Sequence, residues 1–393
     1  MTKAFMQSPG PSPLAWDIFC MVIDNFGDIG VCWRLARQLA DEHDARVRLW
    51  VDDLCAFRRI CPDIDPQAVE QEHGGVQVRH WCADLPSVSP GDIVIEAFAC
   101  HLPEAFVAAM AARRPSPVWI NLEYLSAEDW VAEYHALPSP HPRLPLTKHF
   151  FFPGFNERMG GLLRERDLVA RRDDFRSTPS MQTSFWQTLG FPPPDPQRLV
   201  ISLFAYDKPA LADLLTVWAA GDTPICCLVP TGNAPTALQS FAGSALHPGE
   251  ALLRGNLELR IVPFVAQTDY DRVLWLCDIN LVRGEDSFVR AQWAGRPLLW
   301  QIYPQADDAH LKKLEAFLAL YAAGLSESAA RTTNRLFMVW NSAANAGRIT
   351  PTLWRDYLEA LPELRRHAEN WANQMSQQED LGSQLVRFCR NKL

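Results

Sequence analysis

The chain has 393 residues, of which 48% are hydrophobic and 21% charged, as in ordinary globular proteins large enough for two domains. Its net charge of −9 argues against a nucleic-acid binder that depends on general phosphate attraction. The ten cysteines contain no C-x-x-C pair, which argues against a disulfide framework or a zinc site. No stretch resembles a secretory signal or a spanning helix, so we expect a cytoplasmic protein without a membrane partner.

The first half of the chain predicts strands that alternate with helices. Residues 1–15 are rich in Pro, Ser and Gly and are expected to be a disordered tail. The apolar run Asp17–Ile23 then predicts a buried strand, and helical spacing follows over Gly30–Ala40. Further strands are expected near residues 47–51, 76–81, 93–98 and 118–122, with a helix near residues 103–113. This alternation is typical of a parallel sheet with helices on both faces.

A domain boundary is predicted at Phe191–Pro196, where four of six residues are proline. Such a segment cannot continue a helix and forms a stiff linker. The strand–helix alternation then starts again at Leu199. We therefore expect two Rossmann-like α/β domains that face each other across a cleft, at residues 16–190 and 197–362. A final helix within residues 363–393 is expected to pack back on the N-terminal domain.

The first candidate functional segment is Asp24–Gly30, a Gly-containing turn between the first strand and the first helix. Ligands of open parallel sheets bind beyond the carboxyl ends of strands, which is where this turn lies. Its two carboxylates, Asp24 and Asp28, are suited to accept a proton or to hold a cationic group. The residues alone also allow a structural role, in which Asp28 caps the helix and Asp24 forms the turn.

The second candidate segment is Val282–Gln292, which runs from a strand end into a helix. Arg283, Ser287 and the free N–H groups of the helix are expected to meet phosphate oxygens. Glu285 would repel a diphosphate, so we expect it to face neutral hydroxyls or a cation. The alternative is a helix capped by Ser287 or Asp286, with an ion pair beside it.

Aromatic residues at other strand ends favour a nucleotide pocket. Phe204 and Tyr206 follow the first strand of the second half, and Phe264 and Gln267 follow a later one. A nucleotide base needs a flat apolar partner and an amide that reads its edge, which Phe264 and Gln267 could supply. The histidines show no metal-ligand spacing, and neither a P-loop nor a G-x-S-x-G motif occurs, so no metal is expected.

Four segments together resemble the family of elongation factor P arginine rhamnosyltransferases, called EarP. They are Ile18–Arg37, Asn121–Trp130, Phe151–Phe155 and Arg283–Gln292. The resemblance spans nearly the whole chain after residue 16. It implies a GT-B fold and an inverting transfer of rhamnose from dTDP-β-L-rhamnose to one arginine of elongation factor P, without a metal or other cofactor.

The resemblance also implies roles for individual residues. Asp28 would be the base, Asp24 would hold the guanidinium or the loop, and Glu285 would matter for activity from the donor domain. Donor-binding positions would be Asn25, Phe26, Gly27, Phe204, Tyr206, Phe264, Gln267, Arg283, Gly284, Asp286 and Ser287.

Two other functions compete with this interpretation. One is a GT-B transferase that uses another acceptor, such as a lipid or a small sugar, although no membrane-facing stretch supports it. The other is a nucleotide-sugar-binding protein without catalytic activity, in which donor binding would survive loss of Asp24 and Asp28. We expect a monomer that forms a one-to-one complex with its acceptor.

Overall fold

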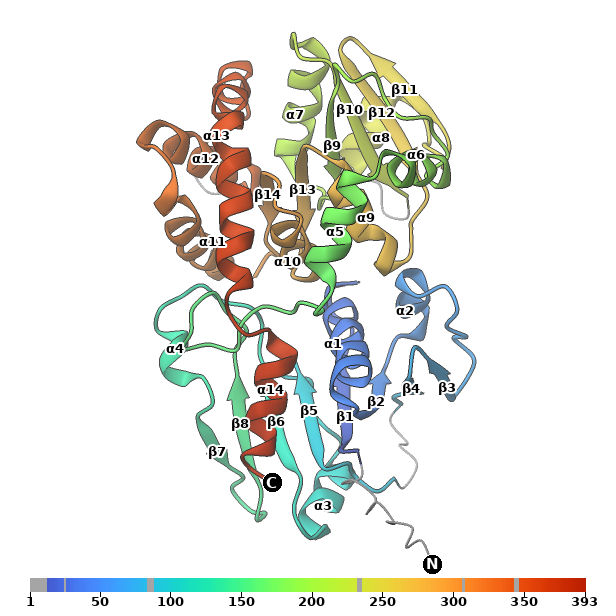
Figure 1. Cartoon of the computed structure of the whole chain (residues 1–393), viewed down its shortest axis with the longest axis vertical. Coiled ribbons are helices and arrows are strands. Elements are labelled where there is room, and N and C mark those ends of the chain that lie inside the picture. Colours follow the sequence, from blue (N-terminus) through green and yellow to red (C-terminus); the bar gives the residue numbers. More distant parts are fainter. Residues whose placement is uncertain (1–12, 25, 83–87, 232–234, 306–307, 343–345) are drawn as a thin grey trace, which may run out of the picture.

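The computed structural model describes residues 13–24, 26–82, 88–231, 235–305, 308–342 and 346–393. Two α/β units lie one above the other along the long axis of the molecule (Figure 1). Most of the predicted tail, residues 1–12, and the candidate residue Asn25 lie outside the described residues. The predicted architecture is confirmed: two mainly parallel sheets in the GT-B arrangement.

The N-terminal unit contains an eight-stranded sheet of order β3-β4-β2-β1-β5-β6-β8-β7. Only the outer pairs β3–β4 and β7–β8 are antiparallel. The strands are β1 (Ala15–Cys20), β2 (Arg46–Val51), β3 (Glu70–His73), β4 (Val76–His80), β5 (Ile93–Ala97), β6 (Val118–Leu122), β7 (Pro138–Pro140) and β8 (Thr147–Phe151). The central strands β5 and β6 are buried along their full length, as expected for parallel strands covered on both faces.

The C-terminal unit contains a six-stranded sheet of order β11-β12-β10-β9-β13-β14. Its strands are parallel except for the outer pair β11–β12. They are β9 (Leu199–Leu203), β10 (Ile225–Pro230), β11 (Ala251–Arg254), β12 (Leu257–Val262), β13 (Ile279–Arg283) and β14 (Leu298–Gln301). The sequence pattern predicted the parallel strands of the N-terminal unit except β8, which lies among prolines and aromatic residues. The short and partly exposed strands β3, β7 and β11 lack the apolar runs on which such a prediction depends.

Helices flank both sheets. In the N-terminal unit they are α1 (Gly27–His43), α2 (Leu54–Ile60), α3 (Glu104–Ala112) and α4 (Val131–Tyr134). The later helices are α5 (Leu168–Ser177), α6 (Pro179–Thr188), α7 (Pro209–Ala220), α8 (Thr236–Ala242), α9 (Gln267–Leu276), α10 (Asp286–Trp293), α11 (Ala309–Tyr321), η2 (Ala322–Gly324), α12 (Glu327–Trp340), α13 (Pro351–Ser376) and α14 (Leu381–Arg390). None of the helices in the described part of the chain has a stretch long and apolar enough to cross a bilayer.

The chain passes into the C-terminal unit earlier than predicted. Helices α5 and α6 belong to the segment assigned above to the N-terminal domain. Their residues Phe175, Phe185 and Trp186 nevertheless pack in the same core as the strands of the second sheet. The proline-rich segment therefore follows two helices of the C-terminal unit instead of preceding it. Prolines indicated where regular structure stops, but they could not show which core the neighbouring helices join.

The chain also returns to the N-terminal unit later than predicted. The expected final helix is two helices, and the bend between them at residues 377–380 carries the chain across. Leu364, Trp371 and Met375 of α13 pack in the C-terminal core, whereas Leu381 and Leu385 of α14 pack in the N-terminal core. Of these two helices, only α14 packs against the N-terminal unit (Figure 1).

The two crossings lie side by side. The side chain of Gln378 donates a hydrogen bond to the carbonyl of Phe155 at 2.9 Å. Leu381 N donates to the carbonyl of Leu162 at 3.1 Å. The two connections between the units are thus bonded to each other.

Candidate active site

The site begins at the carboxyl end of β1, where the chain turns into α1. Asp28 lies in the first turn of α1 and is buried. Its Oδ2 accepts hydrogen bonds from the backbone N–H groups of Ile23 at 2.8 Å and Asp24 at 2.9 Å. Phe26, not Asp28, is the N-cap residue of α1, so the alternative in which Asp28 caps the helix is wrong. The carboxylate instead holds the preceding loop.

The remaining oxygen of Asp28 faces the residue that follows β6. Its Oδ1 accepts a hydrogen bond from the hydroxyl of Tyr124 at 3.2 Å, and the Tyr124 ring stacks on Phe98. Burial raises the pKa of Asp28, against the opposing effect of these hydrogen bonds. A carboxylate with a raised pKa takes up a proton more readily than an ordinary one, which suits a general base.

Asp24 reaches from the first loop to the C-terminal unit. Its Oδ2 accepts a hydrogen bond from the hydroxyl of Tyr206 at 2.7 Å. Burial raises the pKa of Asp24, while Tyr206 and the positive charge of Arg283 lower it. The structure therefore places Asp24 at the junction of the two units, close to the second candidate loop.

Glycines allow the two loops to approach each other closely. A Cβ atom on Gly284 would lie 2.6 Å from Oδ2 of Asp24, and Gly284 has a positive φ of 64°. A Cβ atom on Gly30 would lie 3.2 Å from the carboxyl group of Asp286. Each loop thus has a glycine where the other loop presents a carboxylate.

The second loop follows β13 and leads into α10. The guanidinium of Arg283 lies over two rings, 4.4 Å from the centroid of Phe204 and 4.6 Å from that of Tyr206. The hydroxyl of Ser287 bonds to both the N–H and the carbonyl of Arg283. Ser287 therefore shapes the loop from within.

The start of α10 contradicts the alternative in which the side chain of Ser287 or Asp286 caps this helix. Glu285 is the N-cap residue, and no described side chain makes a capping hydrogen bond there. The carboxyl group of Asp286 instead binds Arg34 at 2.9 Å and Gln267 at 3.1 Å. The predicted caps, Ser287 and Asp286, are thus engaged elsewhere. Unsatisfied N–H groups at a helix start favour an anion.

Glu285 points toward the N-terminal unit. Its Oε2 accepts a hydrogen bond from the backbone N–H of Leu125 at 2.9 Å. Burial, with a smaller contribution from the charge of Asp28, raises the pKa of Glu285 to about 8. Its carboxyl group is therefore mostly protonated at neutral pH in the unliganded protein.

The raised pKa of Glu285 predicts that the wild type loses folding stability as the pH rises, and that Glu285→Gln removes this loss. The folded pKa of about 8 lies above the ordinary value of 4.5, so the folded state binds more protons between these values and stability falls as pH rises. The unfolding free energy of the variant should therefore rise relative to that of the wild type from pH 4.5 to 8, by about 5 kcal/mol at the plateau. Urea denaturation at several pH values measures this difference. A difference independent of pH would contradict the raised pKa.

A pocket between the two units collects most of the predicted donor-binding residues. Phe26 of the first loop meets Phe264 of the C-terminal unit with ring centroids 5.0 Å apart. The side-chain oxygen of Gln267 is buried without a hydrogen-bond partner among the described residues, so it is able to accept a bond from a ligand. The predicted residues that line the pocket are Asp24, Phe26, Gly27, Phe204, Phe264, Gln267, Arg283, Asp286 and Ser287.

Sequence reasoning missed several residues that complete this site. Ser202 and Tyr270 line the pocket, but in the sequence they are an inward-facing strand residue and a helix residue of no special pattern. Arg34 also escaped notice because a lone arginine in an amphipathic helix is usually exposed. Tyr124 lies within a segment noted for its resemblance, yet only the fold shows that its hydroxyl reaches Asp28.

Comparisons with known proteins agree with this geometry. Residues 16–390 match the family model described as Elongation-Factor P (EF-P) rhamnosyltransferase EarP. The chain is 52% identical over 379 residues to the protein-arginine rhamnosyltransferase of Pseudomonas putida, covering 96% of this chain and 99% of that protein. It is 50% identical over 375 residues to that of Pseudomonas aeruginosa, covering 95% and 98%.

A solved structure is similar over nearly the whole chain. It is described as the structural basis for EarP-mediated arginine glycosylation of translation elongation factor EF-P. The two structures superpose with a TM-score of 0.69 at 39% sequence identity, over 97% of this chain and 100% of that one.

Proposed function

Because the chain belongs to the EarP family of elongation factor P rhamnosyltransferases, we propose that it transfers L-rhamnose from dTDP-β-L-rhamnose to one arginine side chain of elongation factor P, with inversion at the anomeric carbon. The relatives are named protein-arginine rhamnosyltransferases, and the solved relative acts on an arginine of EF-P. A translation factor as acceptor is consistent with a cytoplasmic location.

The observation that best supports this proposal is the meeting of two chemically different loops at one pocket. The N-terminal loop brings the carboxylate of Asp24 into the pocket and that of Asp28 beside it, and the C-terminal loop brings the cation Arg283. A guanidinium acceptor needs negative charge and a base, whereas a departing diphosphate needs positive charge. The N-terminal unit thus supplies the negative charge for the acceptor, and the C-terminal unit supplies the positive charge for the diphosphate.

The proposed reaction is a single displacement. A guanidinium nitrogen of the acceptor attacks the anomeric carbon while the bond from that carbon to the diphosphate oxygen breaks. Asp28 takes the proton that the nitrogen loses, and Asp24 holds the guanidinium so that its delocalised lone pair is directed at the sugar. The charge that develops on dTDP is met by Arg283 and the first N–H groups of α10. The proposal therefore assigns no step to a metal, and turnover should persist in EDTA.

Mass spectrometry tests the proposal directly. The purified chain is incubated with dTDP-β-L-rhamnose and elongation factor P, and we expect one added deoxyhexose that fragmentation places on an arginine. NMR of the product should show an α linkage, because inversion converts the β donor into an α product. The matched control is an acceptor with that arginine replaced by lysine.

Two outcomes would favour the competing functions. Donor binding with transfer only to a lipid or small sugar would indicate another GT-B transferase. Donor binding without transfer to any acceptor, including elongation factor P, would indicate a binding protein.

A further inference from the structure

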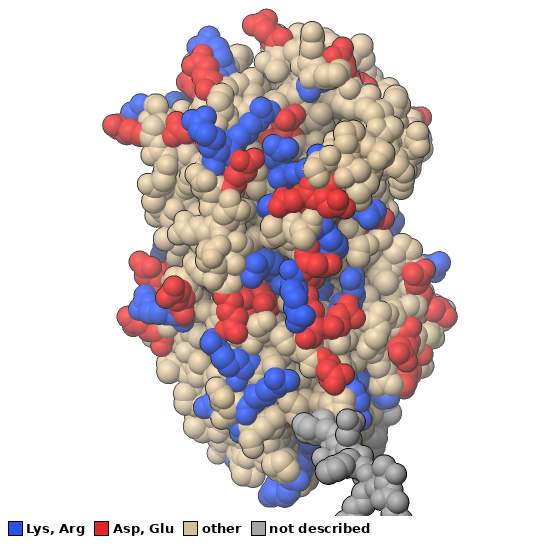
Figure 2. Space-filling view, viewed as in Figure 1, with Lys and Arg blue, Asp and Glu red and all other residues tan. Residues whose placement is uncertain are grey.

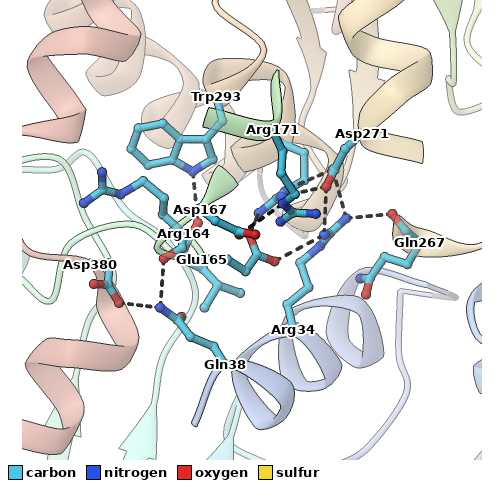
Figure 3. Close-up of polar contacts among 12 residues, drawn as sticks. Arg34, Gln38, Arg164, Glu165, Asp167, Arg171, Gln267, Asp271, Trp293 and Asp380 are labelled. Carbon is cyan, nitrogen blue, oxygen red and sulfur yellow. Dashed lines mark hydrogen bonds and ion pairs between the residues drawn. The ribbon is translucent and has the colours of Figure 1, made fainter. Parts of the chain in front are cut away.

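Five charged side chains form a cluster between the two units, termed the interdomain cluster. It consists of Arg34, Glu165, Asp271, Asp286 and Arg290. Figure 3 shows Arg34 rising from α1 toward Asp271 and Gln267, with Glu165 beside it. Arg34 is 3% exposed, Asp271 2% and Arg290 1%, so water does not screen these charges.

Asp271 is the shared acceptor of the cluster. Arg290 binds it through two hydrogen bonds, at 2.8 and 2.6 Å. Arg34 binds the same carboxylate at 3.2 and 3.3 Å. Glu165, from the segment that crosses between the units, binds Arg290 at 2.7 Å and lies 3.6 Å from Arg34. Salt bridges of this kind are specific in geometry because each guanidinium presents a rigid, planar fork of donors.

Arg34 is the member of the cluster that belongs to the N-terminal unit. Besides Asp271, its guanidinium donates to the carboxylate of Asp286 at 2.9 Å and to the backbone carbonyl of Gln267 at 3.2 Å. The Gln267 side chain in turn donates to the carbonyl of Gly30 at 2.8 Å. Both Asp286 and Gln267 line the donor pocket. One side chain of α1 is thereby bonded to two walls of that pocket.

The same helix carries the proposed base. Helix α1 begins at Gly27, and Asp28 lies in its first turn. A displacement of α1 relative to α9 and α10 would therefore change the distance from Asp28 to a sugar held in the donor pocket. Reactions that depend on near-attack geometry lose about 100-fold in rate for a misplacement of about 1 Å.

We propose that Arg34 is a positioning residue that sets the distance between Asp28 and the donor, and that the interdomain cluster holds the two units in their reactive arrangement. The inference rests on the proposed function, because it presumes that the base and the sugar come from different units. Arg34 itself is not among the residues that line the donor pocket. Its effect is transmitted through α1 on one side and through Asp286 and Gln267 on the other. On the displayed face, charged residues also gather across the junction of the units (Figure 2).

The first test replaces Arg34 by methionine, which keeps the length of the side chain and removes its charge and donors. We expect kcat to fall about 100-fold, whereas the Kd for dTDP should rise by no more than about 10-fold. The matched control is Arg37→Met, the same change one turn further along α1, where the guanidinium lies over the ring of Trp33 instead. That control should keep wild-type kcat.

A second variant separates positioning from folding. The wild-type cluster has two arginines and three carboxylates, a formal charge of −1. Arg34→Met leaves it at −2, and adding Asp271→Asn returns it to −1. The double variant should therefore recover much of the melting temperature that the single variant loses, because an uncompensated buried charge is removed. Its kcat should stay low, because the bonds between α1 and the pocket remain broken.

Small-angle X-ray scattering supplies a measurement that does not depend on the acceptor. Without Arg34, the unliganded enzyme should have a larger radius of gyration than the wild type. Recovery of kcat together with the melting temperature in the double variant would overturn the proposal, as would a kcat within about threefold of wild type in the folded single variant. If the wild type itself transfers no rhamnose, the proposed function is wrong. An unchanged radius of gyration in the Arg34→Met variant would then show separately that the cluster does not hold the two units together.

Discussion

Replacing Asp28 by asparagine is expected to lower kcat about 10³-fold while the affinity for dTDP stays within about threefold of the wild-type value. Asparagine keeps the size of the side chain and an oxygen that can accept the N–H groups of Ile23 and Asp24. It cannot accept a proton from the acceptor nitrogen. Asp28 is not among the residues that line the donor pocket, so donor binding should survive.

Single-turnover transfer to elongation factor P and calorimetric titration with dTDP together measure these two effects. The matched control is Asp52→Asn, because Asp52 also accepts a backbone N–H from just after β1, that of Val22 before the first loop, at 2.9 Å. This control should retain nearly all activity. An active Asp28→Asn variant would show that Asp28 is not the base, and loss of activity only in Asp24→Asn would transfer that role to Asp24.

Replacing Gly284 by alanine is expected to be nearly as damaging, although it adds only one methyl group. The new Cβ would lie 2.6 Å from Oδ2 of Asp24, and the backbone φ of 64° already disfavours any residue with a Cβ. The new Cβ would also lie 3.3 Å from the Tyr206 hydroxyl, so it would crowd both partners of the Asp24–Tyr206 hydrogen bond. We expect kcat to fall about 100-fold, with a loss of stability of about 1–2 kcal/mol from the strained backbone.

A control at a second glycine distinguishes backbone strain from the collision with Asp24. Gly249 also has a positive φ, of 87°, but a Cβ atom there would meet nothing within 4 Å. Gly249→Ala should therefore lose comparable stability in urea denaturation and yet keep wild-type kcat. Equal losses of kcat in the two alanine variants would mean that backbone strain, and not the collision with Asp24, explains the effect at Gly284.

The sequence predicted the parts of the fold that depend on local pattern. Long apolar runs identified the central strands, and the change from strand to helical spacing identified α1 and α10. The division into units was predicted less well, because helices such as α5 carry apolar residues that suit either core. Only the fold shows that Phe175 packs with the C-terminal sheet. A run of prolines indicates where regular secondary structure stops, but it does not indicate in which hydrophobic core the helices before it pack.

The candidate site shows the same limit. Asp24 and Arg283 could be selected because both follow apolar strands, and parallel strands present their carboxyl ends to one edge. The partners of these residues could not be selected. The bonds from Tyr206 to Asp24 and from Arg34 to Asp286 join residues separated by 182 and 252 positions. Such pairs follow from how the two units pack, which no local pattern encodes.

The paired crossings of the chain determine how the molecule can open. The segments at residues 155–164 and 377–381 are bonded to each other, so the two covalent connections between the units meet at one place. We therefore expect any opening of the pocket to be a rotation of the units about these segments, because a few connecting residues can act as a hinge. Glu165 follows directly on the first of these segments, so its bond to Arg290 at 2.7 Å is a contact that such a rotation would strain.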